Sequence, residues 1–472
     1  MVNFSNVPDR TADGLRLGDW PVSTSIYQQP NALLKGSFPL LVVFLFLIFS
    51  AFMEVIPVFG AMRPQLVLAT LGLLAVFGTG QFMKVLSTRV GMCFAAFTAW
   101  FIACVPFGAW PGGSFHVFIE QWYKAALIFI LTAGLLTTLP QANRIFRTIA
   151  YGTGILGLLT LLKNNRTSDG RLVLDNTRYS NANDLAWTLL VGLTFVGYLF
   201  VRGTRTQKVI ALLLGPPMLL TISRTGSRAG ALGAGLLFLL VVIASKRTTR
   251  IRLLAASPVI FLAIIFLLPR DTLIRYTTFF GSYDVYNLSP TERLRMGTIE
   301  STEARKQLLI DSLIVTAKHP FLGVGPGNFD VAQNELAMAR GASKGLWHVT
   351  HNTYTQLSSE MGLPGLAIFI AMLYYIFKTL NDIIRTKTRG PTWDNLRALA
   401  RSLRIAFIVF LPIAFFASLA YDADVPILAG LTTAIGFMAQ KQRAIDRANA
   451  APVASVANPS DAALEPVAVG QY

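Results

Sequence analysis

The chain has 472 residues, of which 53% are hydrophobic and only 14% are charged, and its mean hydropathy is +0.53. A soluble globular domain carries about 25% charged residues, so this composition excludes an ordinary soluble protein and favours a chain that crosses a membrane many times. The formal net charge of +17 is compatible with nucleic-acid binding, but its distribution along the chain indicates another origin. The two cysteines, Cys93 and Cys104, lie in one apolar run and indicate neither a disulfide framework nor a metal site.

The sequence predicts an all-α polytopic membrane protein. Residues 1–37 form a polar lead, residues 38–445 a membrane domain, and residues 446–472, rich in Ala, Pro and Val, a disordered tail. A span needs about 17 to 25 apolar residues, and we count roughly twelve such runs. Their approximate positions are 38–58, 64–80, 88–107, 117–139, 146–163, 185–201, 207–222, 229–245, 253–269, 357–377, 404–420 and 425–440.

The distribution of Lys and Arg predicts the orientation of these spans. Most of these residues lie in alternate connections and in the two ends, whereas the short connections 108–116 and 421–424 contain none. Because cytoplasmic loops carry the excess of Lys and Arg, both termini are expected inside and the long loop 270–355 outside. The positive charge is therefore read as a topology signal, and no nucleic acid is expected as a partner.

The outer loop is predicted to be partly helical. Ser301 or Thr302 is expected to cap a helix that Pro320 ends. An apolar stripe on one face is expected to lie along the membrane interface, towards lipid or the bundle; it consists of Leu309, Ile310, Leu313, Ile314 and Ala317. A second short helix is predicted at 330–340. The segment GVGPGNF at 323–329 resembles a nucleotide fingerprint, but no strand precedes it, and a tight turn with amides facing an anion is the better interpretation.

Two arginines lie where the orientation rule predicts few cations. Arg224 and Arg228 fall in a very short outer turn within SRTGSRAG at 223–230, and would share a face if that turn were helical. A guanidinium binds phosphate oxygens through two parallel charge-assisted hydrogen bonds, which favours phosphate binding over snorkelling to headgroups. The glycines of this segment and Gly233 are expected to allow close helix packing.

Other candidates lie near the point where the outer loop re-enters the membrane. A neutral imidazole there can accept a proton from a hydroxyl, and the residues alone leave both His348 and His351 as candidates, beside a purely structural role. Glu360 is expected about 13 Å deeper in the same helix, paired with Arg224 or Arg228. Arg178 and Arg305 are further outward cations that could line the same cleft.

Three separated segments resemble the O-antigen ligase and polymerase family of bacterial membrane glycosyltransferases. They are NANDLAW at 181–187, SRTGSRAG at 223–230, and the block that runs from Arg305 through HPFLGVGPGNF (319–329) to HNTYTQLSSEMGLPGL (351–366). The resemblance implies a glycosyltransferase-C-like fold and selects His351, which precedes Asn352 and the helix re-entry, as the base that activates the acceptor hydroxyl. It also implies that Arg228 and Arg305, and with less support Arg224, hold a pyrophosphate leaving group.

The activity that the resemblance implies is an inverting, metal-independent transfer without a cofactor. A glycan would pass from an undecaprenyl-diphosphate carrier to a hydroxyl of a glycan, lipid or protein acceptor at the outer face of the inner membrane, in lipopolysaccharide or exopolysaccharide biosynthesis. We favour a ligase; a polymerase and a protein O-oligosaccharyltransferase remain alternatives. A transporter of lipid-linked oligosaccharides is the non-enzyme alternative, but it would place polar residues near the bilayer midplane, whereas here they gather outside.

Overall fold

The structure is a computed structural model that describes residues 25–29, 31–56, 62–167, 170–277 and 290–450, so most of the predicted lead and of the predicted tail lies outside the described residues. The described part is all-α except for one two-stranded antiparallel hairpin, β1 (Asn165–Arg166) and β2 (Leu172–Val173). The all-α character of the predicted fold class is therefore confirmed.

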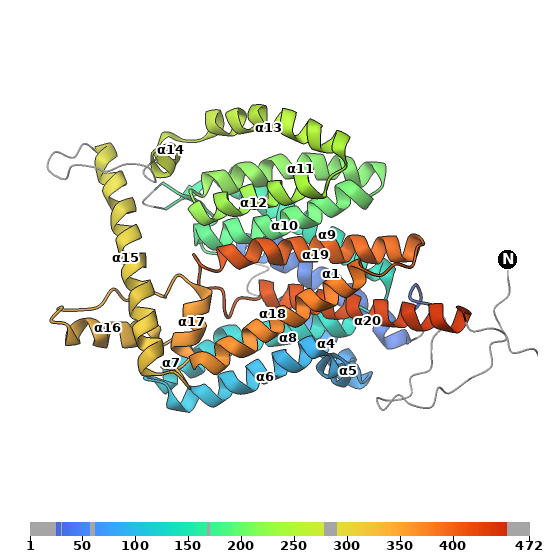
Figure 1. Ribbon diagram of the computed structural model, residues 1–472, viewed down its shortest axis with the longest axis horizontal. Helices are drawn as coiled ribbons and strands as arrows, with labels where there is room; N and C mark the ends of the chain where they lie inside the picture. The colour runs from blue at the N-terminus through green and yellow to red at the C-terminus, as the bar shows by residue number, and fades with distance from the viewer. Residues whose placement is uncertain (1–24, 30, 57–61, 168–169, 278–289, 451–472) are drawn as a thin grey trace, which may run out of the picture.

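Figure 1 shows the order and arrangement of the helices. The first half comprises α1 (Ala32–Ser50), α2 (Phe52–Val55), α4 (Pro64–Gly78), α5 (Gln81–Ser87), α6 (Arg89–Cys104), the 3-10 turn η1 (Val105–Phe107), α7 (Pro111–Val117), the π-helical turn η2 (Phe118–Trp122), α8 (Tyr123–Leu135), α9 (Leu139–Lys163) and α10 (Ala182–Arg202). The second half comprises α11 (Arg205–Arg224), α12 (Arg228–Ala244), α13 (Arg247–Leu267), α14 (Arg270–Thr277), α15 (Pro290–Lys318), α16 (Phe329–Ala339), α17 (Thr353–Glu360), α18 (Gly362–Ile384), α19 (Pro391–Ile413) and α20 (Asp424–Ala450). Helix α20 thus continues past residue 446, where the tail was predicted to begin.

Among the described residues, eight helices are long and apolar enough to cross a membrane, or nine if the bent pair of α4 and α5 counts as one span. Helix α12 is apolar but shorter, and α19 and α20 lie alongside the others without meeting the same test. The twelve apolar runs predicted from the sequence include the runs that correspond to α12, α19 and α20. Helix α13 has no buried residue, and Phe261, Leu262 and Phe266 on it are more than 60% exposed. Such an exposed apolar surface suits contact with lipid tails.

Close helix packing around α10 fixes the centre of the bundle. Helix α10 contacts α9, α11, α12 and α19. A Cβ atom on Gly230 would lie 2.9 Å from Ala186, and one on Gly233 would lie 2.7 Å from Leu190 of α10, so a side chain at either position would crowd the contact between α12 and α10. The prediction of packing glycines is confirmed at these two positions. Gly226 instead forms the turn before α12, with φ +59°.

The short helices α7, α14, α16 and α17 gather at one end of the bundle, on the left in Figure 1, where α15 runs across the ends of the long helices. We call this the loop end. Helix α15 stops before Pro320, as predicted, but it begins at Pro290 and continues through residues 301 and 302, so the predicted capped start is wrong. Helix α16 confirms the second predicted helix. Leu309, Ile310 and Leu313 of the predicted stripe are exposed, and so they face away from the bundle.

A break in the helix changes the predicted position of Glu360. The sequence suggested one helix through residue 360, with its carboxylate well inside a span. Instead α17 ends at Glu360, and α18 begins at Gly362 with φ +69° at that glycine. The glycine-rich turn before α16 packs into the break, with Gly323, Gly325 and Gly327 all at positive φ. The tight turn was thus predicted correctly, and Glu360 lies outside the span that α18 forms.

The orientation gives the first prediction. In a variant without native cysteines, a cysteine at Ser343 in the loop after α16 should react with a membrane-impermeant maleimide in cells with an intact inner membrane. A cysteine at Lys387, in the basic connection between α18 and α19 at the end of the bundle opposite the loop end, should react only after permeabilisation. The reason is that loops rich in Lys and Arg stay on the cytoplasmic side of the membrane. The reverse pattern would contradict the orientation.

Candidate functional site

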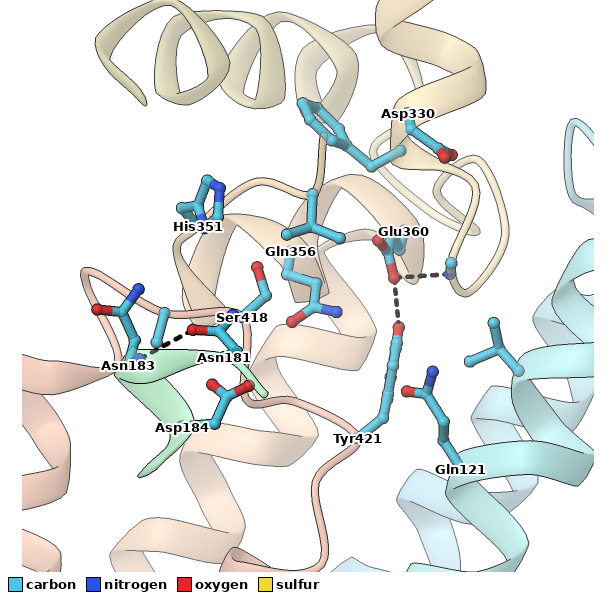
Figure 2. Close-up of a pocket in the computed structure, with 15 residues that line it drawn as sticks. Gln121, Asn181, Asn183, Asp184, Asp330, His351, Gln356, Glu360, Ser418 and Tyr421 are labelled. Carbon is cyan, nitrogen blue, oxygen red and sulfur yellow. Dashed lines mark hydrogen bonds between the residues drawn. The ribbon is translucent and has the colours of Figure 1, made fainter. Parts of the chain in front are cut away.

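A polar cavity of about 290 Å³ lies at the loop end, where six segments of the chain converge (Figure 2). It is lined by Val117, Gln121, Asn181, Asn183, Asp184, Gly327, Phe329, Asp330, Val349, His351, Gln356, Glu360, Ala417, Ser418 and Tyr421. These residues come from α7 and η2, the start of α10, the glycine-rich turn and α16, the loop before α17, α17 itself, and the loop between α19 and α20. The cavity thus depends on segments that are far apart in sequence.

Helix α17 is fixed by hydrogen bonds to the loop between α19 and α20. The Thr353 backbone amide donates to the Ala414 carbonyl at 2.7 Å, and the Thr353 hydroxyl donates to the Ala417 carbonyl at 2.7 Å. Gln356 Oε1 accepts the Ala420 amide at 3.3 Å. These bonds hold the α17 residues that line the cavity against Ser418 and Tyr421 on the opposite wall.

His351 lies on the rim of the cavity in a strained conformation. Its φ of +52° is uncommon for a residue with a side chain, and such a residue costs about 1 to 3 kcal/mol unless its surroundings enforce the conformation. Asn352 enforces it from the next position, since its Oδ1 caps α17 by accepting the amides of Tyr354 and Thr355. The predicted supporting residue Asn352 therefore has a structural role in shaping the backbone at His351.

Burial, and then the nearby positive charges of Arg305 and Arg171, lower the pKa of His351 to about 4. The imidazole is therefore neutral at ordinary pH, as a proton acceptor must be. The ring of His348 lies 6.3 Å from that of His351, but His348 is exposed and does not line the cavity. The geometry therefore favours His351 over its neighbour.

Glu360 lies on another wall and has different partners from those expected. Its Oε2 accepts the Gly327 amide at 2.8 Å and the Tyr421 hydroxyl at 2.7 Å. In the described part of the chain no arginine forms an ion pair with it, so the predicted pairing with Arg224 or Arg228 is wrong. The reason is the helix break, which turns Glu360 towards the glycine-rich turn. The group that the Gly327 amide of this turn faces is thus the Glu360 carboxyl of the chain itself.

The two arginines of SRTGSRAG belong to different helices. Arg224 ends α11, and Arg228 begins α12 after the N-cap Ser227, so the segment between them is a turn and not a shared helical face. The Nε of Arg224 is buried without a hydrogen-bond partner in the described part of the chain. Neither side chain lines the cavity.

This turn is nevertheless tied to the cavity wall through Arg171, a residue that we did not select from the sequence. Arg171 Nε donates to the Thr225 carbonyl at 2.9 Å, and Arg171 Nη2 donates to Asn183 Oδ1 at 2.8 Å. The Ser227 hydroxyl donates to the same Asn183 oxygen at 2.8 Å. The arginine-bearing turn therefore lies directly behind Asn183 of the cavity wall.

The other two predicted arginines have distinct surroundings. Arg305 lies on α15, within electrostatic reach of His351. Arg178 Nη2 is 2.9 Å from Oδ1 of the buried Asp424, whose Oδ2 accepts the Thr188 hydroxyl. Arg178 does not line the cavity; its ion pair joins the loop before α10 to the start of α20. The structure thus brings His351, Glu360 and Arg305 to one site and places Arg178 in a neighbouring structural contact.

Several cavity residues were not selected from the sequence. Asp184, Gln356 and Tyr421 line the cavity, yet Asp184 was read only as part of a helix entry and Gln356 as part of a helix. The i, i+4 spacing of Gln356 and Glu360 was an available signal, because both then share one face of α17. No group of three or more His, Cys, Asp or Glu residues in the described chain is arranged to hold a metal ion.

Glu360 gives a prediction on stability. Burial raises its pKa from an ordinary 4.5 to about 7, although the hydrogen bonds from Gly327 and Tyr421 act in the opposite direction. Because its pKa is higher in the folded state than in the unfolded state, Glu360 contributes its full stability at a pH below the unfolded-state pKa. This contribution is lost as the pH rises through about 7. Thermal unfolding in detergent should therefore show that Glu360→Gln is stabilised relative to wild type as the pH rises from about 5 to 8.

The control for this prediction is Glu335→Gln, which removes an exposed carboxylate of α16 and should melt in parallel with wild type at every pH. Parallel melting of Glu360→Gln and wild type would mean that Glu360 does not titrate in this range.

Part of the chain matches a known family. Residues 209–370 match the family model described as O-antigen ligase. The matched segment contains Arg228, Arg305, His351 and Glu360, and ends before the loop that carries Tyr421. No curated protein matches the chain. Over residues 209–370 the chain is therefore similar to the O-antigen ligase family.

Proposed function

We propose that the protein transfers a glycan from a polyprenyl-diphosphate carrier to an acceptor hydroxyl at the outer face of the inner membrane, as an O-antigen or surface-polysaccharide ligase. The observation that carries the proposal is the neutral imidazole of His351 at the rim of a polar cavity at one end of a helical bundle. A site at the end of the bundle is accessible both to a lipid-linked donor and to water.

In the proposed reaction His351 accepts the proton of the acceptor hydroxyl as the oxygen attacks the anomeric carbon of the donor. The bond from that carbon to the diphosphate oxygen breaks, and its electron pair stays on the leaving group. Attack opposite to the leaving group inverts the anomeric centre. The activated donor supplies the free energy, so the proposal requires neither a nucleotide nor a metal ion.

Arginines are proposed to stabilise the charge that develops on the leaving group. Arg305 acts on His351 electrostatically from α15, and Arg228 begins α12 beside Ser227, which contacts the cavity wall. Fixed guanidinium groups in a partly dehydrated site stabilise a leaving diphosphate more effectively than mobile water does. Arg224, from the same turn, is a secondary candidate, and the ion pair of Arg178 with Asp424 makes a direct role for Arg178 less favoured.

A polymerase and a protein O-oligosaccharyltransferase would use the same chemistry with a different acceptor. Glycan analysis of a deletion strain distinguishes the first two, since polymer left on its carrier indicates a ligase and single repeat units indicate a polymerase. A transporter would need polar groups near the middle of the spans. The cavity lies at the loop end instead, which favours an enzyme.

The test of the proposed base is His351→Ala. Removal of a positioned general base lowers a rate by about 10²- to 10⁴-fold, so transfer in membranes should become hard to detect while the protein level stays normal. His348→Ala is the matched control and should be mild. Because the pKa of His351 is about 4, wild-type transfer should not decline through its protonation between about pH 5.5 and 7.5. Normal transfer by His351→Ala would contradict histidine catalysis.

The proposed leaving-group arginines are tested by Arg228→Lys and Arg305→Ala. The lysine keeps the charge at 228 but loses the two-pronged geometry, and the alanine removes the charge at 305, so the rate of transfer should fall strongly in both variants. Lys306→Ala, which changes the exposed neighbouring cation on α15, is the control and should retain transfer. Near-wild-type rates in both arginine variants would exclude them from diphosphate binding.

A further inference from the structure

The cavity below His351 has a composition that suits an uncharged ligand. Its described lining contains the carboxylates of Asp184, Asp330 and Glu360, together with several side-chain amides and hydroxyls, but no lysine or arginine. Carboxylates accept hydrogen bonds and repel other anions. A diphosphate is therefore disfavoured inside this space, whereas a sugar offers many hydroxyl donors to it.

We propose that this cavity is the acceptor subsite, which holds the sugar that carries the attacking hydroxyl, and that Asp184 positions that sugar. The inference rests on the proposed function, because it assigns one substrate of that reaction to one part of the site. The volume of about 290 Å³ is at the low end of the range for ligand pockets, about 300 to 1,000 Å³, and so fits one sugar ring better than an oligosaccharide.

Asp184 is the strongest single observation for this subsite. It lies in the first turn of α10 and lines the cavity, yet its carboxylate forms no hydrogen bond or ion pair with the described part of the chain. The other carboxylates are engaged, since Glu360 accepts from Gly327 and Tyr421, and Asp330 accepts from the Val331 amide. A partly buried carboxylate without a hydrogen-bond donor in the described part of the chain is arranged to accept hydrogen bonds from a ligand.

The position of His351 indicates which substrate occupies the cavity. The imidazole lies on the rim, with Asp184, Gln356 and Glu360 on one side of it (Figure 2). The positive charges of Arg305 and Arg171 act on it as well, and neither arginine lines the cavity. A sugar in the cavity with one hydroxyl at the rim can give its proton to His351, while the diphosphate of the donor remains among the arginines outside.

The proposed reaction transfers one proton, forms one bond and breaks one bond. The proton of the acceptor hydroxyl moves to the imidazole, the acceptor oxygen forms a bond to the anomeric carbon, and the carbon–oxygen bond to the diphosphate breaks with its electron pair on the phosphate oxygen. The imidazolium then releases its proton to water. Asp184 takes no part in these bonds; it is a positioning residue that holds the other hydroxyls of the acceptor sugar.

The kinetic test compares Asp184→Asn with Asp175→Asn, which changes an exposed carboxylate in the loop before α10. A hydrogen bond to a charged group contributes enough that its loss should raise KM for the acceptor about 10- to 100-fold. The KM for the lipid-linked donor should stay unchanged in both variants, and Asp175→Asn should match wild type. A rise in the donor KM with an unchanged acceptor KM would assign the cavity to the donor sugar and overturn the proposal.

A binding test separates this inference from the proposed function. Saturation-transfer NMR on the purified protein in detergent should detect methyl glycosides of common hexoses, with a signal that falls in Asp184→Asn and persists in Asp175→Asn. Binding of inorganic pyrophosphate should be the same in all three proteins. Equal glycoside signals in all three would overturn the subsite, whereas a wild-type protein that binds glycosides but transfers no glycan would contradict the proposed function alone.

Discussion

The geometry of the loop end depends on how the chain satisfies its backbone polar groups at the break between α17 and α18. In a membrane protein an exposed amide or carbonyl without a partner is costly, so irregular backbone persists only where other segments supply hydrogen bonds. Here the Val324 and Gly325 amides donate to the carbonyls of Ser359 and Glu360, both at 2.9 Å, and the Trp100 indole donates to the Met361 carbonyl at 2.8 Å. The glycine-rich turn is therefore a structural partner of α17, and it fixes the wall of the cavity that carries Glu360.

The same constraint explains the neutral histidine. Because α17 begins immediately after His351, the N-cap by Asn352 and the bond between the Thr350 and Ser418 hydroxyls hold the backbone on both sides of it. The imidazole is largely buried, and its burial together with two nearby arginines lowers its pKa and keeps it unprotonated. Strain, neutrality and position at the rim thus have one local cause, which supports a role in proton transfer more strongly than any of the three alone.

The all-α class, the glycine turn and the packing glycines could be predicted from the sequence, because each follows from a local pattern. His351 was selected through the family resemblance, and the structure places it in the lining of the cavity. The sequence alone was not sufficient where long-range contacts determine the position of a residue. Glu360 was assigned to an arginine because a continuous helix would have placed it inside a span, and only the contacts of the glycine-rich turn reveal the break. Arg178 and Arg171 lie in the same polar connection, and nothing in their spacing shows that one pairs with Asp424 while the other reaches Asn183. Asp184 looked like an ordinary first-turn residue of a helix, because the cavity beside it is formed by distant segments.

Helix α15 connects the proposed chemistry to the membrane. Arg305 and Leu309 are four residues apart and so lie on one face of the helix, and Leu309, Ile310 and Leu313 are exposed. The helix runs across the ends of the long helices rather than along them (Figure 1). A surface that combines an apolar stripe with a cation suits a ligand that has a lipid tail and a charged headgroup. Under the proposed function a lipid-linked diphosphate would approach His351 along α15, while the acceptor sugar would occupy the cavity, whose described lining contains no lysine or arginine.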